Sequence, residues 1–179
     1  MESALNIQNY VQDGFEKVCT VTLSGEENNH YNWFYKDINQ DLMYADHRSW
    51  LYFIVVNGEI WKVGETGNPL GVRYKRDTWR SQPKPGTEGR LGRYRTGNYG
   101  GDVRMDTDWA IRERLHNEIN EGALVEFWAK KCPVASIEVT VAGNKEYVGS
   151  AIHKELEMSY LDYIFEETEN LPKLNKLRK

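Results

Sequence analysis

The most informative part of the chain is WLYFIVVNGEIWKVG, residues 50–64. Its first seven residues are apolar and rich in aromatic and β-branched side chains, a composition typical of a buried strand. Asn57 and Gly58 then supply the pair of residues that best tolerates the positive φ angles of a tight hairpin turn. Residues 59–63 return as the second strand. The sequence therefore predicts a β-hairpin around which a small sheet is built.

The segments on either side of this hairpin alternate between helical and strand periodicity. In chain order, the expected elements are a short helix from Ser3 to about Asp13, a strand at 17–23, a short helix at 72–80, a helix that begins at Asp106 or Asp108 and ends near Asn120, strands at 124–129 and 137–141, and a last helix at about 147–167. Residues 81–104 are expected to form a long exposed loop. The predicted fold class is α/β, with a small and mainly antiparallel central sheet flanked by helices.

The length of 179 residues fits one domain with a short extension. We interpret residues 1–47 as an N-terminal accessory segment and residues 48–179 as the main domain, with a basic insertion at about 80–104. The first residues lack the charge and apolar pattern of a signal peptide, and no apolar run is long enough for a membrane helix. The two cysteines have no zinc spacing, and P-loop, GxSxG and GxGxxG motifs are absent. A soluble cytoplasmic protein is expected.

Basic residues are concentrated in one part of an acidic chain. The net charge is −4, yet residues 73–104 contain nine basic and three acidic side chains, a local charge of +6. Aromatic side chains are interspersed among them, and such a strip suits contact with phosphates and unstacked bases. From charge alone, a solvated loop is an equally open interpretation. The candidate nucleic-acid contacts are Arg76, Arg80, Arg90, Arg93, Tyr94 and Arg95.

Four separated motifs occur in an order that is similar to that of a nuclease superfamily. They are WLY at 50–52, KVG at 62–64 with its continuation to Thr66, Arg73 on the expected short helix, and LE at 156–157 followed by LPKLN at 171–175. Each motif is short and weak alone, but together they resemble the GIY-YIG nucleases over about 125 residues. The resemblance implies a small metal-dependent phosphodiesterase fold that cuts nucleic acid.

The resemblance also implies roles for three residues of the first motifs. Phosphodiester hydrolysis needs a deprotonated water and neutralisation of charge on the phosphate. Tyr52 would accept the proton of the water, and because a phenol is a weak base at neutral pH it needs a nearby cation. Lys62 is that cation or a phosphate ligand, and Arg73 would bind the non-bridging phosphate oxygens.

A carboxylate on the last helix is the implied metal ligand. Glu157 would bind Mg²⁺ (or Mn²⁺), an ion that prefers oxygen ligands and keeps several waters. Its rival is Glu155, which a helical wheel places on the wet side, whereas Glu157 falls at the edge of the apolar face. Asn175 would tie the C-terminal segment back near the site, by analogy with the family.

The sequence departs from the family pattern at two positions. Lys62 stands where the second motif usually has tyrosine, and Asp77 stands where several relatives have His or Tyr. Tyr74 and Tyr94 are candidates for that vacant role. We expect a DNA endonuclease, and RNA or branched DNA stays open as substrate. The alternative is a non-catalytic nucleic-acid-binding module with the same fold, belonging to a larger phage, mobile-element or defence assembly.

Overall fold

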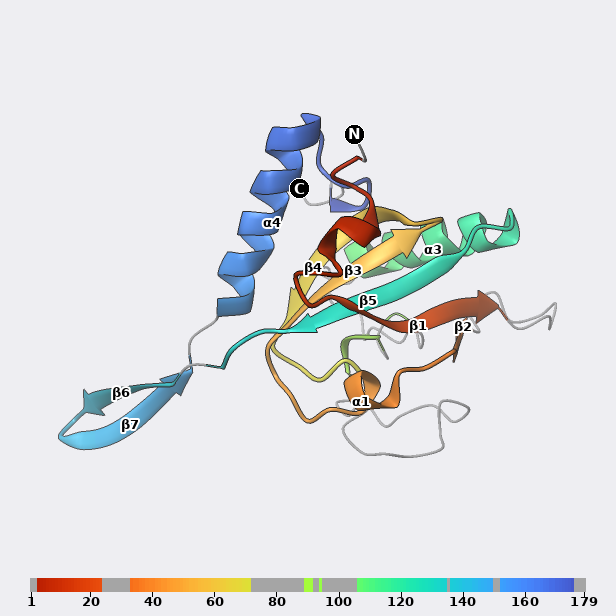
Figure 1. Cartoon of the computed structure of the whole chain (residues 1–179). Helices are drawn as coiled ribbons and strands as arrows, with labels where there is room; N and C mark the ends of the chain where they lie inside the picture. Colours follow the sequence, from red (N-terminus) through yellow and green to blue (C-terminus); the bar gives the residue numbers. More distant parts are fainter. Residues whose placement is uncertain are drawn as a thin grey trace.

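The computed structural model describes residues 3–23, 33–71, 89–91, 94, 106–134, 136–149 and 152–175, and the backbone alone for residues 106–109. The predicted fold class is confirmed: the protein is α/β, and its main sheet has five strands in the order β2-β1-β5-β3-β4, all paired antiparallel (Figure 1). The strands of this sheet are β1 (Glu16–Leu23), β2 (Trp33–Lys36), β3 (Trp50–Val56), β4 (Glu59–Thr66) and β5 (Val125–Lys131). The helices are η1 (Ile7–Tyr10), α1 (Gln40–Met43), α3 (Asp106–Asn120) and α4 (Ile152–Thr168).

The β3–β4 hairpin forms as the sequence predicts. Val56 pairs with Glu59 across a two-residue turn in which Asn57 has φ of 51° and Gly58 has φ of 82°. These are the left-handed angles that an Asn-Gly pair tolerates best. A bulge after Ile54 shifts the register by one residue, and β4 continues to Thr66, three residues further than expected. The hairpin occupies one side of the sheet, with β4 at the edge.

The sheet separates two hydrophobic cores because successive side chains of a strand point to opposite faces. In the first core, Trp50, Tyr52 and Ile54 of β3 pack with Ile111 and Leu115 of α3, which lies behind the sheet in Figure 1. The second core, on the other face, consists of Leu51, Phe53 and Val55 of β3 together with residues of η1 and α4. Every residue of β3 is buried, which explains its continuous apolar run.

The first 47 residues contribute directly to this architecture. β1 lies between β2 and β5 inside the main sheet, and Phe15 is fully buried in the second core. The prediction of a helix from Ser3 to Asp13 is wrong, because this segment forms only a 3-10 turn at residues 7–10. Asn6 caps that turn by accepting a hydrogen bond from the Gln8 amide.

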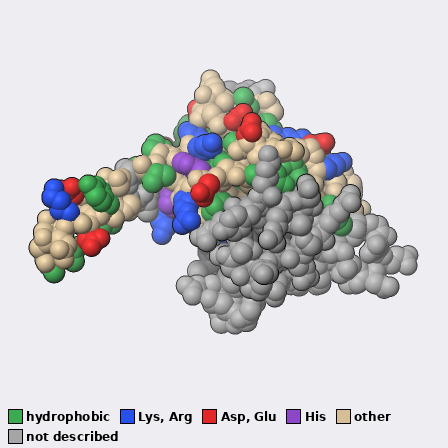
Figure 2. Space-filling view, turned by 90° about the horizontal axis from the view of Figure 1, so that it is seen from below, with side chains coloured by type: hydrophobic (Ala, Val, Ile, Leu, Met, Phe, Trp, Pro, Cys, Tyr) green, Lys and Arg blue, Asp and Glu red, His purple; other side chains and the backbone are tan. Residues whose placement is uncertain are grey.

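The C-terminal third differs from the expectation at one point. Residues 144–149, partly assigned to the last helix, instead form strand β7 (Asn144–Gly149), which pairs with β6 (Ser136–Val141). Ala142 and Gly143 both have positive φ and close this hairpin, whose residues are nearly all exposed. The hairpin projects from the body of the molecule both in Figure 1 and in the view from below in Figure 2, and α4 begins at Ile152. Within the described residues, no helix combines the length and apolar character needed to cross a membrane.

Candidate active site

Tyr52 lies in the interior of the sheet, directly opposite Gly64 of the second motif. A β-carbon added to Gly64 would overlap the phenol ring and hydroxyl of Tyr52. Any side chain at position 64 would therefore displace the tyrosine, so the contact between the two motifs requires glycine. The phenol is also deeply enclosed, with only 1% of Tyr52 exposed.

The Tyr52 hydroxyl belongs to a small cluster with Arg90 and Tyr94. Arg90 Nε donates a hydrogen bond to the Tyr52 oxygen at 3.0 Å, and Arg90 Nη2 donates to the Tyr94 oxygen at 3.1 Å. The two hydroxyl groups share a further hydrogen bond at 3.2 Å. The guanidinium carbon also lies 4.9 Å from the Tyr94 ring centroid, within cation–π range. One arginine thus places positive charge beside the candidate base.

The backbone around Arg90 is anchored to the body of the protein. The Arg90 amide donates to the Pro69 carbonyl and the Leu91 amide donates to the Leu70 carbonyl, both at 2.9 Å. The Tyr35 hydroxyl donates to the Leu91 carbonyl at 2.6 Å, in the buried interior. The prediction of a long exposed loop at 81–104 is therefore wrong for the part that the structure describes, because apolar and aromatic side chains of this segment fill the first core.

The same burial changes the interpretation of Tyr94. We expected this residue to contact nucleic acid by stacking, but its ring is fully buried and stacks on Trp33, with 6.5 Å between the ring centroids. A base therefore has no access to this ring in the structure. The Tyr94 hydroxyl instead contacts the Tyr52 hydroxyl at 3.2 Å. Arg90, which was also expected to contact nucleic acid, is half-buried.

Lys62 lies on the same face of the hairpin as Tyr52. It pairs with Ile54, two residues further along β3, and the side chains of Lys62 and Tyr52 are diagonal neighbours on adjacent strands. Only 2% of Lys62 is exposed. A lysine on an edge strand usually extends into solvent, and this one does not. Its amino group is therefore held on the enclosed side of the hairpin and not in bulk water.

Glu157 lies on the inner face of α4. The buried residues of this helix are His153, Glu157, Leu161 and Ile164, which recur every three or four positions and so share one side. Glu157 is 5% exposed, whereas Glu155 is on the exposed side. Glu157 therefore lies on the buried side of the helix and Glu155 on the exposed side.

His153 lies on the buried side of α4. It is 8% exposed and contacts residues from two other parts of the chain. Its Nδ1 lies 3.1 Å from the Ser49 hydroxyl, and its Nε2 lies 3.3 Å from a carboxylate oxygen of Glu65 on β4. This network holds the start of α4 against the hairpin. Of the residues in this network, only Glu65, which directly follows Gly64 in the second motif, belongs to a motif singled out in the sequence.

Tyr52 and Glu157 approach the edge strand from opposite faces of the sheet. The phenol contacts Gly64 on the face with α3, while Glu65, the next residue, points to α4 and contacts His153 one turn before Glu157. Tyr52 therefore lies against Gly64, and the helix that carries Glu157 contacts Glu65, the adjacent residue of β4. Among the described residues, no group of three or more His, Cys, Asp or Glu side chains is placed to hold a metal ion. One or two carboxylates with water would still suit Mg²⁺, which seldom uses an all-protein site.

Asn175 ties the C-terminal segment to the second motif. Its side-chain oxygen accepts from the Val63 amide and its side-chain nitrogen donates to the Val63 carbonyl, both at 2.8 Å. The Leu174 amide adds a hydrogen bond to the Trp61 carbonyl at 2.8 Å. The segment therefore covers the outer edge of β4 beside Lys62 and Gly64, as the resemblance implied.

Arg112 is a buried cation that no sequence pattern singles out. It lies on α3 with no exposed surface, and its guanidinium carbon is 5.4 Å from the Trp33 ring centroid. The remaining basic candidates lie outside the described residues: Arg73, Arg76, Arg80, Arg93 and Arg95.

Comparison with known proteins adds one finding about the fold. No family model matches the chain, and no curated protein matches it. Among solved structures, the chain is similar to a mutant form of EndoII from bacteriophage T4, with a TM-score of 0.53 and 16% identity over 93% of this chain and 99% of that one. It is also similar, with a TM-score of 0.49 and 17% identity over 96% of this chain and 85% of the other, to the restriction endonuclease HPY188I in complex with product DNA. The likeness to EndoII spans nearly the whole of both chains and shows that they share a fold.

Proposed function

We propose that this chain is a metal-dependent endonuclease of the GIY-YIG type that hydrolyses phosphodiester bonds in DNA. The fold that it shares with EndoII supports a nuclease-like architecture. The observation that carries the proposal is the contact between the two named motifs: Tyr52 is pressed against Gly64, and Arg90 donates to its hydroxyl oxygen. A tyrosine needs no such arrangement to serve as a core residue.

The cluster suits a base that removes a proton from water. An arginine that donates to a phenol oxygen stabilises negative charge on that oxygen, since charge-assisted hydrogen bonds are about twice as strong as neutral ones. Lys62, buried on the same face, adds a second positive charge. Tyr52 therefore acts as the base, with Arg90 and Lys62 as the cations that support it.

The remaining roles belong to residues nearer the phosphate. Arg73 would bind the non-bridging oxygens, and Arg76, Arg80, Arg93 and Arg95 would follow the nucleic-acid backbone. Glu157 would hold one Mg²⁺ or Mn²⁺ ion, which supplies Lewis-acid stabilisation of the phosphate when bound. Because Glu157 is largely buried on α4, its carboxylate is held in a fixed position by the packed helix.

One observation favours the second candidate, a nucleic-acid-binding module without turnover. Tyr52 and Lys62 are 1% and 2% exposed, so a phosphate does not reach them in this conformation. Catalysis therefore requires a local movement that exposes the Tyr52 hydroxyl to substrate while Arg90 stays within hydrogen-bond reach of it. A module that only binds DNA needs no such movement.

The test compares the full-length protein with two variants of α4 on supercoiled plasmid. We expect cleavage with Mg²⁺ and none with EDTA. Glu157→Gln abolishes cleavage while DNA binding persists, and Glu155→Gln, a matched change on the exposed side of the same helix, cleaves normally. Binding without cleavage by the unmodified protein over a panel of DNA and RNA substrates identifies the binding module. Cleavage by Glu157→Gln at the normal rate removes Glu157 as the metal ligand.

A further inference from the structure

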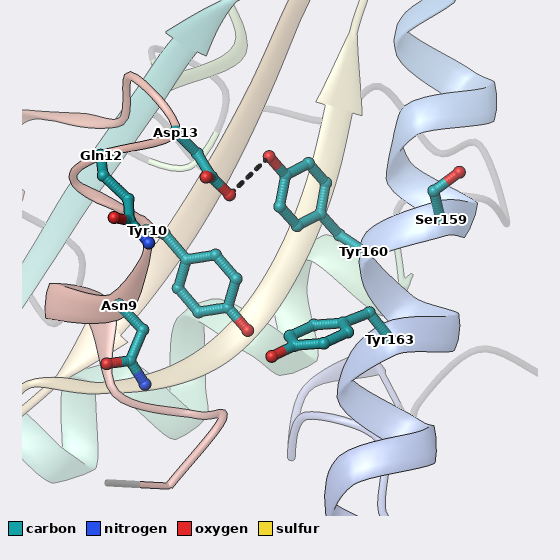
Figure 3. A pocket seen from close by; sticks show the side chains of 7 residues that line it. All are labelled: Asn9, Tyr10, Gln12, Asp13, Ser159, Tyr160 and Tyr163. Atoms are coloured by element: carbon teal, nitrogen blue, oxygen red, sulfur yellow. Dashed lines mark hydrogen bonds between the residues drawn. The ribbon is translucent and has the colours of Figure 1, made fainter.

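A recess lies on the opposite face of the sheet from Tyr52. It has a volume of about 400 Å³ and is lined by residues of two segments that are far apart in the sequence (Figure 3). The lining residues are Asn9, Tyr10, Gln12 and Asp13 around η1, and Ser159, Tyr160 and Tyr163 on α4. The volume is within the range of small-molecule sites. The proposed nuclease chemistry uses none of these side chains.

The aromatic walls of this recess are built into the second core. The Tyr160 ring lies 5.8 Å from Tyr10 and meets Phe15 and Phe53 edge-on at 5.5 and 5.9 Å. Tyr10 is 3% exposed, and its hydroxyl donates to the Ala4 carbonyl at 2.6 Å. Tyr163 is half exposed and forms the outer wall. Two of the three phenols are therefore fixed before any ligand arrives.

The charge of the recess is negative. Asp13 is the one charged side chain among the lining residues, and its carboxylate accepts a hydrogen bond from the Tyr160 hydroxyl at 3.1 Å (Figure 3). Burial raises the pKa of Tyr10, and the nearby acidic groups of Tyr163, Asp13 and Glu167 raise it further. Lys130 of β5 is the nearby cation: its Nζ donates to the Tyr160 hydroxyl at 3.4 Å and lies 5.8 Å from the Tyr160 ring centroid, but the residue does not line the recess. The lining thus contains one carboxylate and no cationic side chain, which favours a cation over an anion as ligand.

We propose that this recess binds an organic cation, an ammonium group that carries alkyl substituents. Cations are attracted to the faces of aromatic rings, and tyrosine rings that surround an alkylammonium group are a known means of recognising it. The carboxylate of Asp13 adds a direct charge interaction beside the rings. An apolar ligand of the same shape would gain the ring contacts but not the electrostatic attraction.

The experiment titrates the full-length protein with choline chloride at constant ionic strength, followed by calorimetry and by NMR shifts. We expect saturable binding that 3,3-dimethylbutan-1-ol, the neutral carbon isostere of choline, does not reproduce at the same concentrations. Asp13→Asn and Tyr163→Leu should each weaken choline binding by about fivefold or more, as expected for the loss of one charge or one ring contact. The amide that Asp13→Asn introduces can still accept the hydrogen bond from Tyr160, and residue 163 is exposed, so both variants should fold. Asp162→Asn, on the exposed side of α4, is the matched control and should bind choline normally.

Three outcomes overturn the proposal. Choline binding that does not saturate, or that sodium chloride reproduces, shows that the recess does not recognise alkylammonium groups. Equal binding of the neutral isostere shows a merely apolar recess. Unchanged choline affinity in both Asp13→Asn and Tyr163→Leu places the binding elsewhere on the protein.

Discussion

Replacement of Asn175 by alanine should destabilise the protein far more than its position near the C-terminus suggests. The side chain satisfies both polar groups of Val63 on the outer edge of β4, at 2.8 Å each, and it is 4% exposed. Alanine removes two hydrogen bonds and leaves two backbone groups without these partners. A buried polar group left unsatisfied costs about 1–3 kcal/mol. Since water can partly reach an edge strand, we expect a loss in the lower half of that range for each group, about 3 kcal/mol in total.

The assay is urea denaturation followed by tryptophan fluorescence, with the midpoint of thermal unfolding as a second measurement. A loss of about 3 kcal/mol lowers the melting temperature by roughly 6–12 °C in a protein of this size. Lys173→Ala is the control from the same segment: its side chain is 52% exposed and pairs with Glu59 at 3.1 Å. An exposed ion pair contributes about 0–1 kcal/mol. If Asn175→Ala loses no more stability than Lys173→Ala, the two hydrogen bonds do not hold the edge strand as argued.

Three further predictions concern the candidate site. Gly64→Ala should destabilise the protein by about 1–3 kcal/mol through overpacking against Tyr52, and most of this loss should vanish in the Tyr52→Ala background; an equal loss in both backgrounds in urea melts would contradict the contact. Arg90→Lys should lower the cleavage rate by about tenfold or more with little change in DNA affinity, because a lysine cannot donate to both phenol oxygens from a planar fork; a rate equal to that of the unmodified protein would exclude Arg90 from catalysis. DNA affinity measured by fluorescence anisotropy should fall steeply between about 50 and 200 mM salt, and a flat response would show that the basic strip at 73–104 is not the contact surface.

The hairpin and the helix α3 could be predicted from the sequence because their signals are local. Asn57 and Gly58 specify the turn whatever surrounds them, and the run of residues 50–56 has the composition of a buried strand. The Asn175 contact was predicted from a motif and not from periodicity. Asn175 and Val63 are 112 residues apart in the sequence, so a local sequence pattern cannot show that they are in contact.

The contacts that the sequence did not predict depend on tertiary packing. Arg90 meets Tyr52 because Tyr35 and the backbone of Pro69 and Leu70 hold its segment in the core. A glycine- and proline-rich composition indicates an exposed loop, and no periodicity marks the buried residues within it. Likewise, His153 is buried because Glu65 and Ser49 offer it polar partners, which compensate for the polar side chain on the inner face of α4.

Because β4 lies at the edge of the sheet, side chains on both faces of the sheet could contact one phosphate. A phenol on one face and a carboxylate on the other cannot approach a common substrate through a continuous sheet, because the backbone and neighbouring strands separate them. At an edge strand no further strand intervenes, and the two faces meet within the width of one chain. Among the described residues, the C-terminal segment covers this edge at Trp61 and Val63. Under the proposed function, the substrate would meet the edge of β4 beyond Val63. At Gly64 the Tyr52 phenol fills the space that a side chain would occupy, so the candidate base lies directly against the edge strand.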